Sequence, residues 1–216
     1  MPFIREAVEG AMDLWEQCLR HPFLLELHEG RLPERKFTNY IVQDSIYLRE
    51  YARVFGVGIQ RSETYRDLRM FYSQLGFVTE RESAARVRWL REHGISEGQA
   101  DRMPALPACR DYTRFMLGEA AVGGLPEIMM ATLPCTLSYF YLFDNLLQRY
   151  PGVREQPYWY VVSEYTGEGY RQVCETLGVY AEGLCSGLPG ARRDRLQWIF
   201  RRASEHELAF WDMAYA

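Results

Sequence analysis

The stretch Thr132-Leu133-Pro134-Cys135-Thr136-Leu137-Ser138-Tyr139 places a proline and a thiol inside a segment that otherwise has the pattern of one long helix. Pro134 has no backbone N–H and crowds the preceding turn, so we expect a kink that frees the carbonyl of Met130 and opens the helix wall beside Cys135. Tyr139 follows four residues later and shares the helix face of the thiol. Taken alone, the stretch is more typical of a buried cysteine that packs as a small apolar side chain, because reactivity needs surroundings that lower the thiol pKa.

Apolar residues recur at three- and four-residue spacing along the whole chain, which predicts helices from end to end. A loop is expected from His21-Pro22-Phe23 through Gly30, and strict alternation typical of strands is absent. The sequence therefore predicts a single all-α domain over residues 1–216, packed as a bundle of about seven or eight helices. The expected helical segments cover residues 3–19, 34–60, 64–92, a stretch from 109 that pauses at 123–126, the Cys135 helix to about 149, 158–183 with weak points at Gly167 and Gly169, and 191 onward.

Composition argues against several classes of protein. The chain has 216 residues, 48% of them hydrophobic and 25% charged, with a formal net charge of −4. No basic run offers a footprint for nucleic acid, and no run of about 18 apolar residues could span a membrane. The N-terminus lacks the apolar core of a signal peptide. The five cysteines are an odd set without a C-x-x-C pair, which favours a reducing compartment, so we predict a cytoplasmic protein with no nucleic-acid or membrane partner.

A stripe of tyrosines interrupted by an aspartate marks the 34–60 segment. Tyr40, Asp44, Tyr47 and Tyr51 are spaced by four, three and four residues and therefore share one helix face. A carboxylate on such a face is costly to bury unless it is paired. Asp44 either braces the core by accepting from a tyrosine hydroxyl, or lies at the floor of a pocket and accepts an N–H of a ligand.

Acidic residues stand beside large aromatics near the C-terminus, in Glu205-His206-Glu207-Leu208-Ala209-Phe210-Trp211-Asp212-Met213. A carboxylate desolvated against aromatic rings has a raised pKa and becomes a proton donor near neutral pH. The alternative is a solvated acidic face with Phe210 and Trp211 as core anchors. The residues alone leave both alternatives open.

Metal and phosphate chemistry have little support in the sequence. Carboxylate-bridged di-iron sites in helix bundles use Glu-x-x-His pairs, and no histidine of this chain has a glutamate three residues before it. A glycine-rich phosphate loop is also missing. We therefore expect neither a metal nor another cofactor.

The chain resembles the TenA family, also called thiaminase II, over nearly its whole length. The fold of that family is the haem-oxygenase-like helical bundle, and the cysteine is typical of the branch with a catalytic thiol. The resemblance rests on the order and spacing of Trp15, His21-Pro22-Phe23, Gly30-Arg31-Leu32, Phe37, Tyr40, Gln43-Asp44-Ser45-Ile46-Tyr47-Leu48, Tyr112, Leu133-Pro134-Cys135, Tyr139, Tyr158, Tyr165, Glu207 and Phe210-Trp211-Asp212-Met213-Ala214.

The resemblance implies an aminopyrimidine aminohydrolase of thiamin salvage. Such an enzyme hydrolyses 4-amino-5-aminomethyl-2-methylpyrimidine, and also thiamin, to 4-amino-5-hydroxymethyl-2-methylpyrimidine. The resemblance implies Cys135 as nucleophile, Asp44 as the group that holds the amino group and a ring nitrogen, and Glu207, three residues before the Phe-Trp pair, as the carboxylate that handles protons. The expected substrate-binding residues are Tyr47, Tyr112, Tyr139 and Tyr165.

The resemblance also implies a homotetramer. Large residues near helix ends, such as Phe71-Tyr72 and Phe140-Tyr141, would then pair across closed interfaces. The sequence departs from the family pattern at Val161, at Thr136-Leu137 and at Phe143-Asp144-Asn145. These changes leave the implied reacting groups intact and bear on pocket shape, and hence on the exact substrate.

Two other functions remain alternatives. One is a non-hydrolytic, metal- or cofactor-dependent oxidase of the same fold, which iron retained through purification would favour. The other is a protein that binds an aminopyrimidine without turnover, which a multiple-turnover assay would identify.

Overall fold

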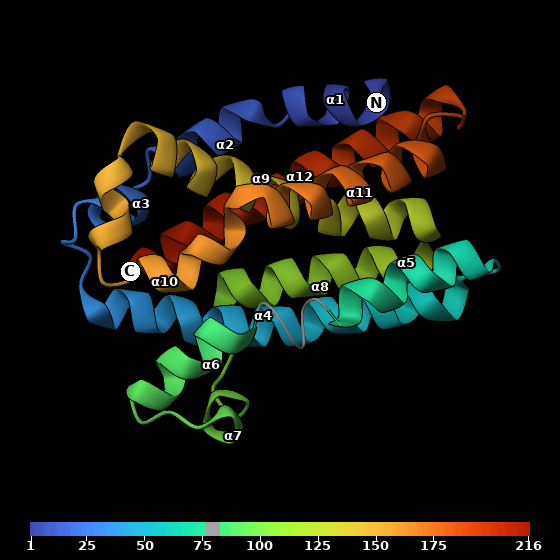
Figure 1. The fold of residues 1–216 in the computed structure, drawn as a ribbon. Helices are drawn as coiled ribbons and strands as arrows, with labels where there is room; N and C mark the ends of the chain where they lie inside the picture. The colour runs from blue at the N-terminus through green and yellow to red at the C-terminus, as the bar shows by residue number, and fades with distance from the viewer. Residues whose placement is uncertain (77–82) are drawn as a thin grey trace.

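The computed structural model describes residues 1–76 and 83–216. This part of the chain forms twelve α-helices and two 3₁₀ helices, with no strand, which confirms the predicted all-α class (Figure 1). None of the described helices is both long and apolar enough to cross a membrane. In chain order the elements are α1 (Pro2–Glu9), α2 (Met12–Leu19), α3 (Pro22–His28), α4 (Glu34–Arg61), α5 (Tyr65–Gly76), α6 (Ser83–Glu92), α7 (Glu97–Ala100), α8 (Pro107–Val122), α9 (Leu125–Arg149), η2 (Pro151–Glu155), α10 (Trp159–Val162), η3 (Ser163–Tyr165), α11 (Gly167–Cys185) and α12 (Gly190–Tyr215).

The C-terminal helix α12 runs through the middle of the bundle (Figure 1). It packs against α9, α8 and α4, and on its other flank against α1, α2 and α3. The helix α4 in turn packs against α5, α8 and α9. Helices α4, α8, α9 and α12 are therefore mutual neighbours, and the side chains that they turn toward one another form the centre of the molecule.

The N-terminal region differs from the predicted pattern in two places. The helix expected over residues 3–19 is divided into α1 and α2 at Gly10, a residue with poor helix propensity, and Ala11 has non-helical backbone angles. The loop expected after His21 is instead the helix α3. Pro22 occupies its first turn, where no N–H is needed, and the His21 Nδ1 accepts the backbone N–H of Phe23 at 3.1 Å.

One more predicted helix is divided, and another falls partly outside the described residues. In the segment 64–92 the structure describes α5 and α6, and the predicted continuity through residues 77–82 lies outside the described part of the chain. The segment 158–183 consists of α10, η3 and α11, with the break at Gly167, whose φ of 80° lies in the left-handed region. This confirms Gly167 as a weak point. The described residues thus form more and shorter helices than the seven or eight predicted.

Candidate active site

The tyrosine stripe of α4 is buried, as its spacing predicts. Tyr40, Asp44, Tyr47 and Tyr51 are each no more than 5% exposed. On the facing helix α9, the helical backbone continues through Pro134 and brings Cys135 into the bundle. A kink at Pro134 remains a prediction, but the proline does not end the helix.

Cys135 differs from the other cysteines in its surroundings. All five thiols are free, and Cys135 is half-buried whereas the other four are buried. Burial raises the pKa of Cys109, Cys174 and Cys185 to about 12, and it also raises that of Cys18. These four match the interpretation of cysteine as a small apolar side chain, whereas Cys135 faces ionisable groups.

Glu207 is the ionisable group that lies against this thiol. It is 2% exposed, and the Tyr112 hydroxyl donates to its Oε1 at 2.6 Å. Burial raises the pKa of Glu207 to about 8, and the charge of Asp44 adds to this rise. The hydrogen bonds with Tyr112 and Cys135 act in the opposite direction and lower the pKa. Glu207 is therefore largely protonated at neutral pH, with its carboxyl group next to the thiol.

The neighbouring acid Glu205 is placed quite differently. Its side chain is 38% exposed and pairs with Arg202 at 2.6 Å. The residue pattern left open whether the C-terminal acids are buried against aromatic rings or exposed to solvent. In the structure Glu207 is buried against Tyr112 and Cys135, whereas Glu205 lies on the solvated face.

Asp44 is buried, and its carboxylate accepts no hydrogen bond from another side chain within the described residues. It is 5% exposed, and the hydroxyl groups of Tyr40, Tyr47 and Tyr51 donate to other acceptors, so the predicted alternative in which a tyrosine hydroxyl donates to Asp44 is not observed. Burial raises its pKa to about 7, and the positive charge of Arg86 opposes the rise. Arg86 comes from α6 and donates to Ser45 at 2.6 Å. No sequence pattern indicates this contribution, since Arg86 stands in an amphipathic segment rich in arginine and glutamate.

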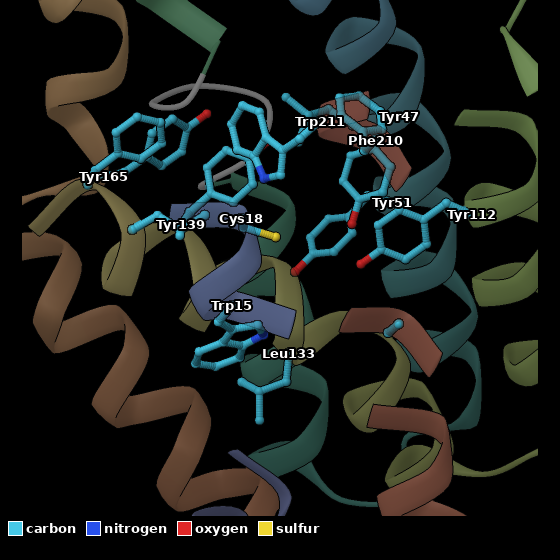
Figure 2. Close-up of a cluster of buried hydrophobic side chains, with 14 of the residues drawn as sticks. Trp15, Cys18, Tyr47, Tyr51, Tyr112, Leu133, Tyr139, Tyr165, Phe210 and Trp211 are labelled. Carbon is cyan, nitrogen blue, oxygen red and sulfur yellow. The ribbon is translucent and has the colours of Figure 1, made fainter. Parts of the chain in front are cut away.

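Aromatic side chains gather in two groups in this region, Tyr47, Tyr112 and Phe210 in one and Tyr139 and Tyr165 in the other (Figure 2). In the first group, the ring centroid of Tyr47 lies 4.9 Å from that of Tyr112 and 5.8 Å from that of Phe210. Burial raises the pKa of Tyr47 and Tyr112 well above the ordinary value, and the nearby Cys135 and Glu207 add to both shifts. These phenols therefore stay protonated and can donate hydrogen bonds.

In the second group, Tyr139 receives a hydrogen bond from the Tyr40 hydroxyl at 3.4 Å. The ring of Tyr165 meets that of Tyr139 edge-on with centroids 4.8 Å apart, and Trp211 stacks on Tyr139 at 5.4 Å. Tyr165 therefore lies one ring further out along this wall, behind Tyr139. The structure brings all seven predicted site residues into one buried region. Within the described residues no three His, Cys, Asp or Glu side chains gather as metal ligands.

Comparison with known proteins identifies the family of this chain. Residues 10–216 match the model of the TENA/THI-4/PQQC family. The chain belongs to this family. The resemblance deduced from the sequence motifs is thereby confirmed.

Individual relatives match over almost their whole length. The chain is 29% identical to an aminopyrimidine aminohydrolase from Helicobacter pylori, covering 96% of this chain and 95% of that protein. It is also 29% identical to an aminopyrimidine aminohydrolase from Halalkalibacterium halodurans, covering 100% and 96%. Among solved structures, a TenA homologue from Pyrococcus horikoshii superposes with a TM-score of 0.88 at 26% identity, covering 99% of this chain and 98% of that one. The TenA-like helical fold is thus confirmed.

Proposed function

We propose that this TenA family protein is an aminopyrimidine aminohydrolase of the thiaminase II type that works by covalent cysteine catalysis in thiamin salvage. The observation that carries the proposal is the contact between a half-buried thiol, Cys135, and a buried carboxylic acid, Glu207, whose raised pKa suits a proton donor. The nearly full-length relatives named aminopyrimidine aminohydrolase support the same substrate class.

Asp44 is the group that we assign to substrate binding. Its carboxylate is buried and has no hydrogen-bond donor among the described side chains, so a ligand that supplies donors would remove a desolvation cost. An aminopyrimidine offers an exocyclic amino group, and its adjacent ring nitrogen can share a proton with the carboxyl group. The neighbouring rings of Tyr47 and Tyr112, with centroids 4.9 Å apart, are aromatic surfaces on which a planar ring can pack.

The thiolate of Cys135 would then attack the electron-poor pyrimidine ring. A C–S bond forms, ring aromaticity is lost, and the electron pair moves toward the exocyclic methylene as the C–N bond to the leaving amine breaks. Glu207 supplies the proton that the leaving amine takes up. Water next adds to the methylene and gives its proton to the Glu207 carboxylate, the C–S bond breaks as the ring regains aromaticity, and the thiolate and the Glu207 acid are both restored. Covalent catalysis thereby divides one slow displacement by water into two easier steps.

Further assignments follow from the same proposal. The substrate is a small pyrimidine, the chain acts as one domain without a cofactor in the cytoplasm, and four copies assemble into a homotetramer. The departures at Val161 and Thr136-Leu137 bear on which pyrimidine is preferred. Val161 is buried on α10, and Thr136 is buried on α9 beside the thiol.

The deciding experiment measures release of 4-amino-5-hydroxymethyl-2-methylpyrimidine from the aminomethylpyrimidine and from thiamin, side by side under multiple turnover. We expect release from at least one substrate, and loss of release in Cys135→Ser. Tight binding of the pyrimidine without turnover would replace the proposal by a binding protein. Iron retained through purification together with oxygen consumption would replace it by an oxidase.

A further inference from the structure

The turn of α9 that carries the thiol is short of one backbone hydrogen bond. Pro134 has no N–H, so the helix supplies no donor to the carbonyl four residues earlier, that of Met130. Cys135 follows directly, and its position in a continuing helix therefore depends on contacts from outside α9. The neighbouring helices supply such contacts at the same turn.

Tyr51 of α4 contacts both ends of this turn. Its hydroxyl oxygen lies 3.2 Å from the carbonyl oxygen of Thr132 and 3.3 Å from the Thr136 Oγ1. A carbonyl can only accept, so the Tyr51 proton is donated to Thr132, and the Thr136 hydroxyl donates to the Tyr51 oxygen. One phenol thus joins the residue three before Cys135 to the residue directly after it.

The contact is firmly anchored on the α4 side. Tyr51 is 5% exposed, and its ring meets Phe55 edge-on with centroids 4.8 Å apart. It stands one helical turn beyond Tyr47, with centroids 5.6 Å apart, so Tyr51 and Tyr47 lie on the same face of α4 (Figure 2). On the opposite side of the turn, the thiol of Cys174 from α11 donates to the Thr136 carbonyl at 3.7 Å.

We propose that Tyr51 and Thr136 are positioning residues, whose paired hydroxyl groups hold the turn 132–136 against α4 so that the Cys135 thiol stays in contact with Glu207 and the phenols. This inference rests on the proposed function for the role of the thiol. Both hydroxyl groups contact residues of this turn. They affect the reaction only through the orientation of the thiol. The pair is additional to the residues already assigned as nucleophile, acid and substrate contacts.

Three substitutions test the pair. Tyr51→Phe keeps the ring and removes the hydroxyl, Thr136→Val removes the second hydroxyl at similar shape, and Thr136→Ser retains it. The matched control is Tyr158→Phe, because the Tyr158 hydroxyl also donates to a buried backbone carbonyl, that of Leu32 at 2.9 Å, outside the site. The measurements are kcat and KM, and the rate of iodoacetamide alkylation of Cys135 against pH, followed by mass spectrometry of the peptide that contains it.

We expect Tyr51→Phe to lower kcat by about 10- to 100-fold with little change in KM, the scale associated with a misplaced reacting group. The alkylation profile of Cys135 should move to higher pH, because the thiolate loses its hydrogen bond with the protonated Glu207. Thr136→Val should behave in the same way and Thr136→Ser should restore the parent values. The double variant should lose little more than Tyr51→Phe, since both hydroxyl groups act through one contact. Tyr158→Phe should leave the alkylation profile unchanged.

The proposal is overturned if Tyr51→Phe keeps kcat within about twofold and leaves the alkylation profile unchanged. If Tyr51→Phe does not fold, the comparison between Thr136→Val and Thr136→Ser decides, and equal values in both overturn the proposal. Failure of the proposed function has a different signature. Turnover retained in Cys135→Ser would refute the covalent step, while the alkylation profiles would still report whether Tyr51 and Thr136 hold the thiol.

Discussion

At the scale of single residues, the site is defined by two buried acids that influence each other. The charge of Asp44 contributes to the raised pKa of Glu207, and both carboxyl groups are almost fully removed from solvent. Two such groups close together do not both ionise readily, so the pair retains a proton at neutral pH. That proton is available for transfer, and the remaining charge is available to a ligand with N–H donors. The same pair therefore serves both catalysis and binding.

The first residue-scale prediction concerns the thiol. Cys135→Ser should leave the fold intact and lower turnover by several orders of magnitude, because a hydroxyl is a far poorer nucleophile than a thiolate near neutral pH. Circular dichroism and steady-state kinetics measure the two effects. Cys185→Ala is the control, because this thiol is buried away from the site and its loss should change stability alone. A serine variant that keeps more than about a tenth of the parental rate would contradict the covalent mechanism.

The second residue-scale prediction separates Glu207 from its neighbour. If Glu207 protonates the leaving amine, turnover should fall as pH rises through about 8, where this acid loses its proton. Glu207→Gln should remove most turnover of the aminopyrimidine and abolish that basic limb. Thiamin, whose thiazolium leaves without a proton, should suffer less at this step. The control Glu205→Gln alters an exposed acid paired with Arg202. Equal small losses in both variants would refute the assignment.

At the scale of helices, the sequence predicts the faces better than the boundaries. The spacing of Tyr40, Asp44, Tyr47 and Tyr51 correctly identified the buried face of α4, because helical periodicity is a local property. The break at His21-Pro22 predicts a loop, although a proline is equally suited to the first turn of a new helix. What decides between the two is the capping contact made by His21, which a pattern of apolar residues does not contain.

Contributions from other helices were the least predictable part of the site. The positive charge of Arg86 on α6 acts on Asp44, and Tyr51 of α4 contacts the cysteine turn of α9. Both interactions depend on how helices pack and not on the spacing of residues within one helix. The identity of the buried acid was predictable only through the family pattern, since Glu205 and Glu207 are equivalent by composition. Packing explains the difference, because only Glu207 turns toward Tyr112.

The helix-scale prediction tests the cap of α3. The His21 Nδ1 accepts from Phe23, so the ring proton lies on Nε2 and is donated to Asp212 Oδ1 at 3.2 Å, joining α3 to α12. His21→Ala removes both contacts and should lower the free energy of unfolding by about 1–2 kcal/mol, whereas His21→Asn keeps a capping acceptor and should lose less. Urea denaturation measures both. Arg20→Ala, which removes only an exposed pair with Glu16, is the control. Equal losses for alanine and asparagine would exclude the cap as the cause.

At the scale of the whole molecule, the expected tetramer needs outward-facing apolar residues. Phe71 does not supply one, because it is fully buried against Phe55, whereas Tyr72 is 70% exposed. Phe140 and Leu137 line an apolar groove between α1, α9 and α11, together with Val8 of α1. Light scattering at micromolar concentration should give the mass of four chains. Tyr72→Glu and Phe140→Glu should shift that mass downward if these surfaces pair, and a monomeric parent protein would contradict the prediction.

The last prediction concerns the pH dependence of global stability. The pKa of Asp44 is about 7 in the folded protein against 3.8 for an ordinary aspartate, so between these values the unfolded chain is ionised while the folded chain holds a proton. Unfolding then releases a proton, and the contribution of Asp44 to stability falls as pH rises from about 4 to about 7 and is constant above. Asp44→Asn removes this dependence. Relative to the parent, the variant should therefore gain unfolding free energy as pH rises, reaching a few kcal/mol by pH 8.5, since each pKa unit corresponds to about 1.4 kcal/mol. Urea denaturation across pH 4–9 measures this difference, with substitution of an exposed aspartate, Asp194→Asn, as the control. If the difference in unfolding free energy between variant and parent does not change with pH, Asp44 is ionised in the folded protein at little cost. The raised pKa of Asp44 would then be refuted, and with it the desolvation cost that a bound ligand is proposed to remove.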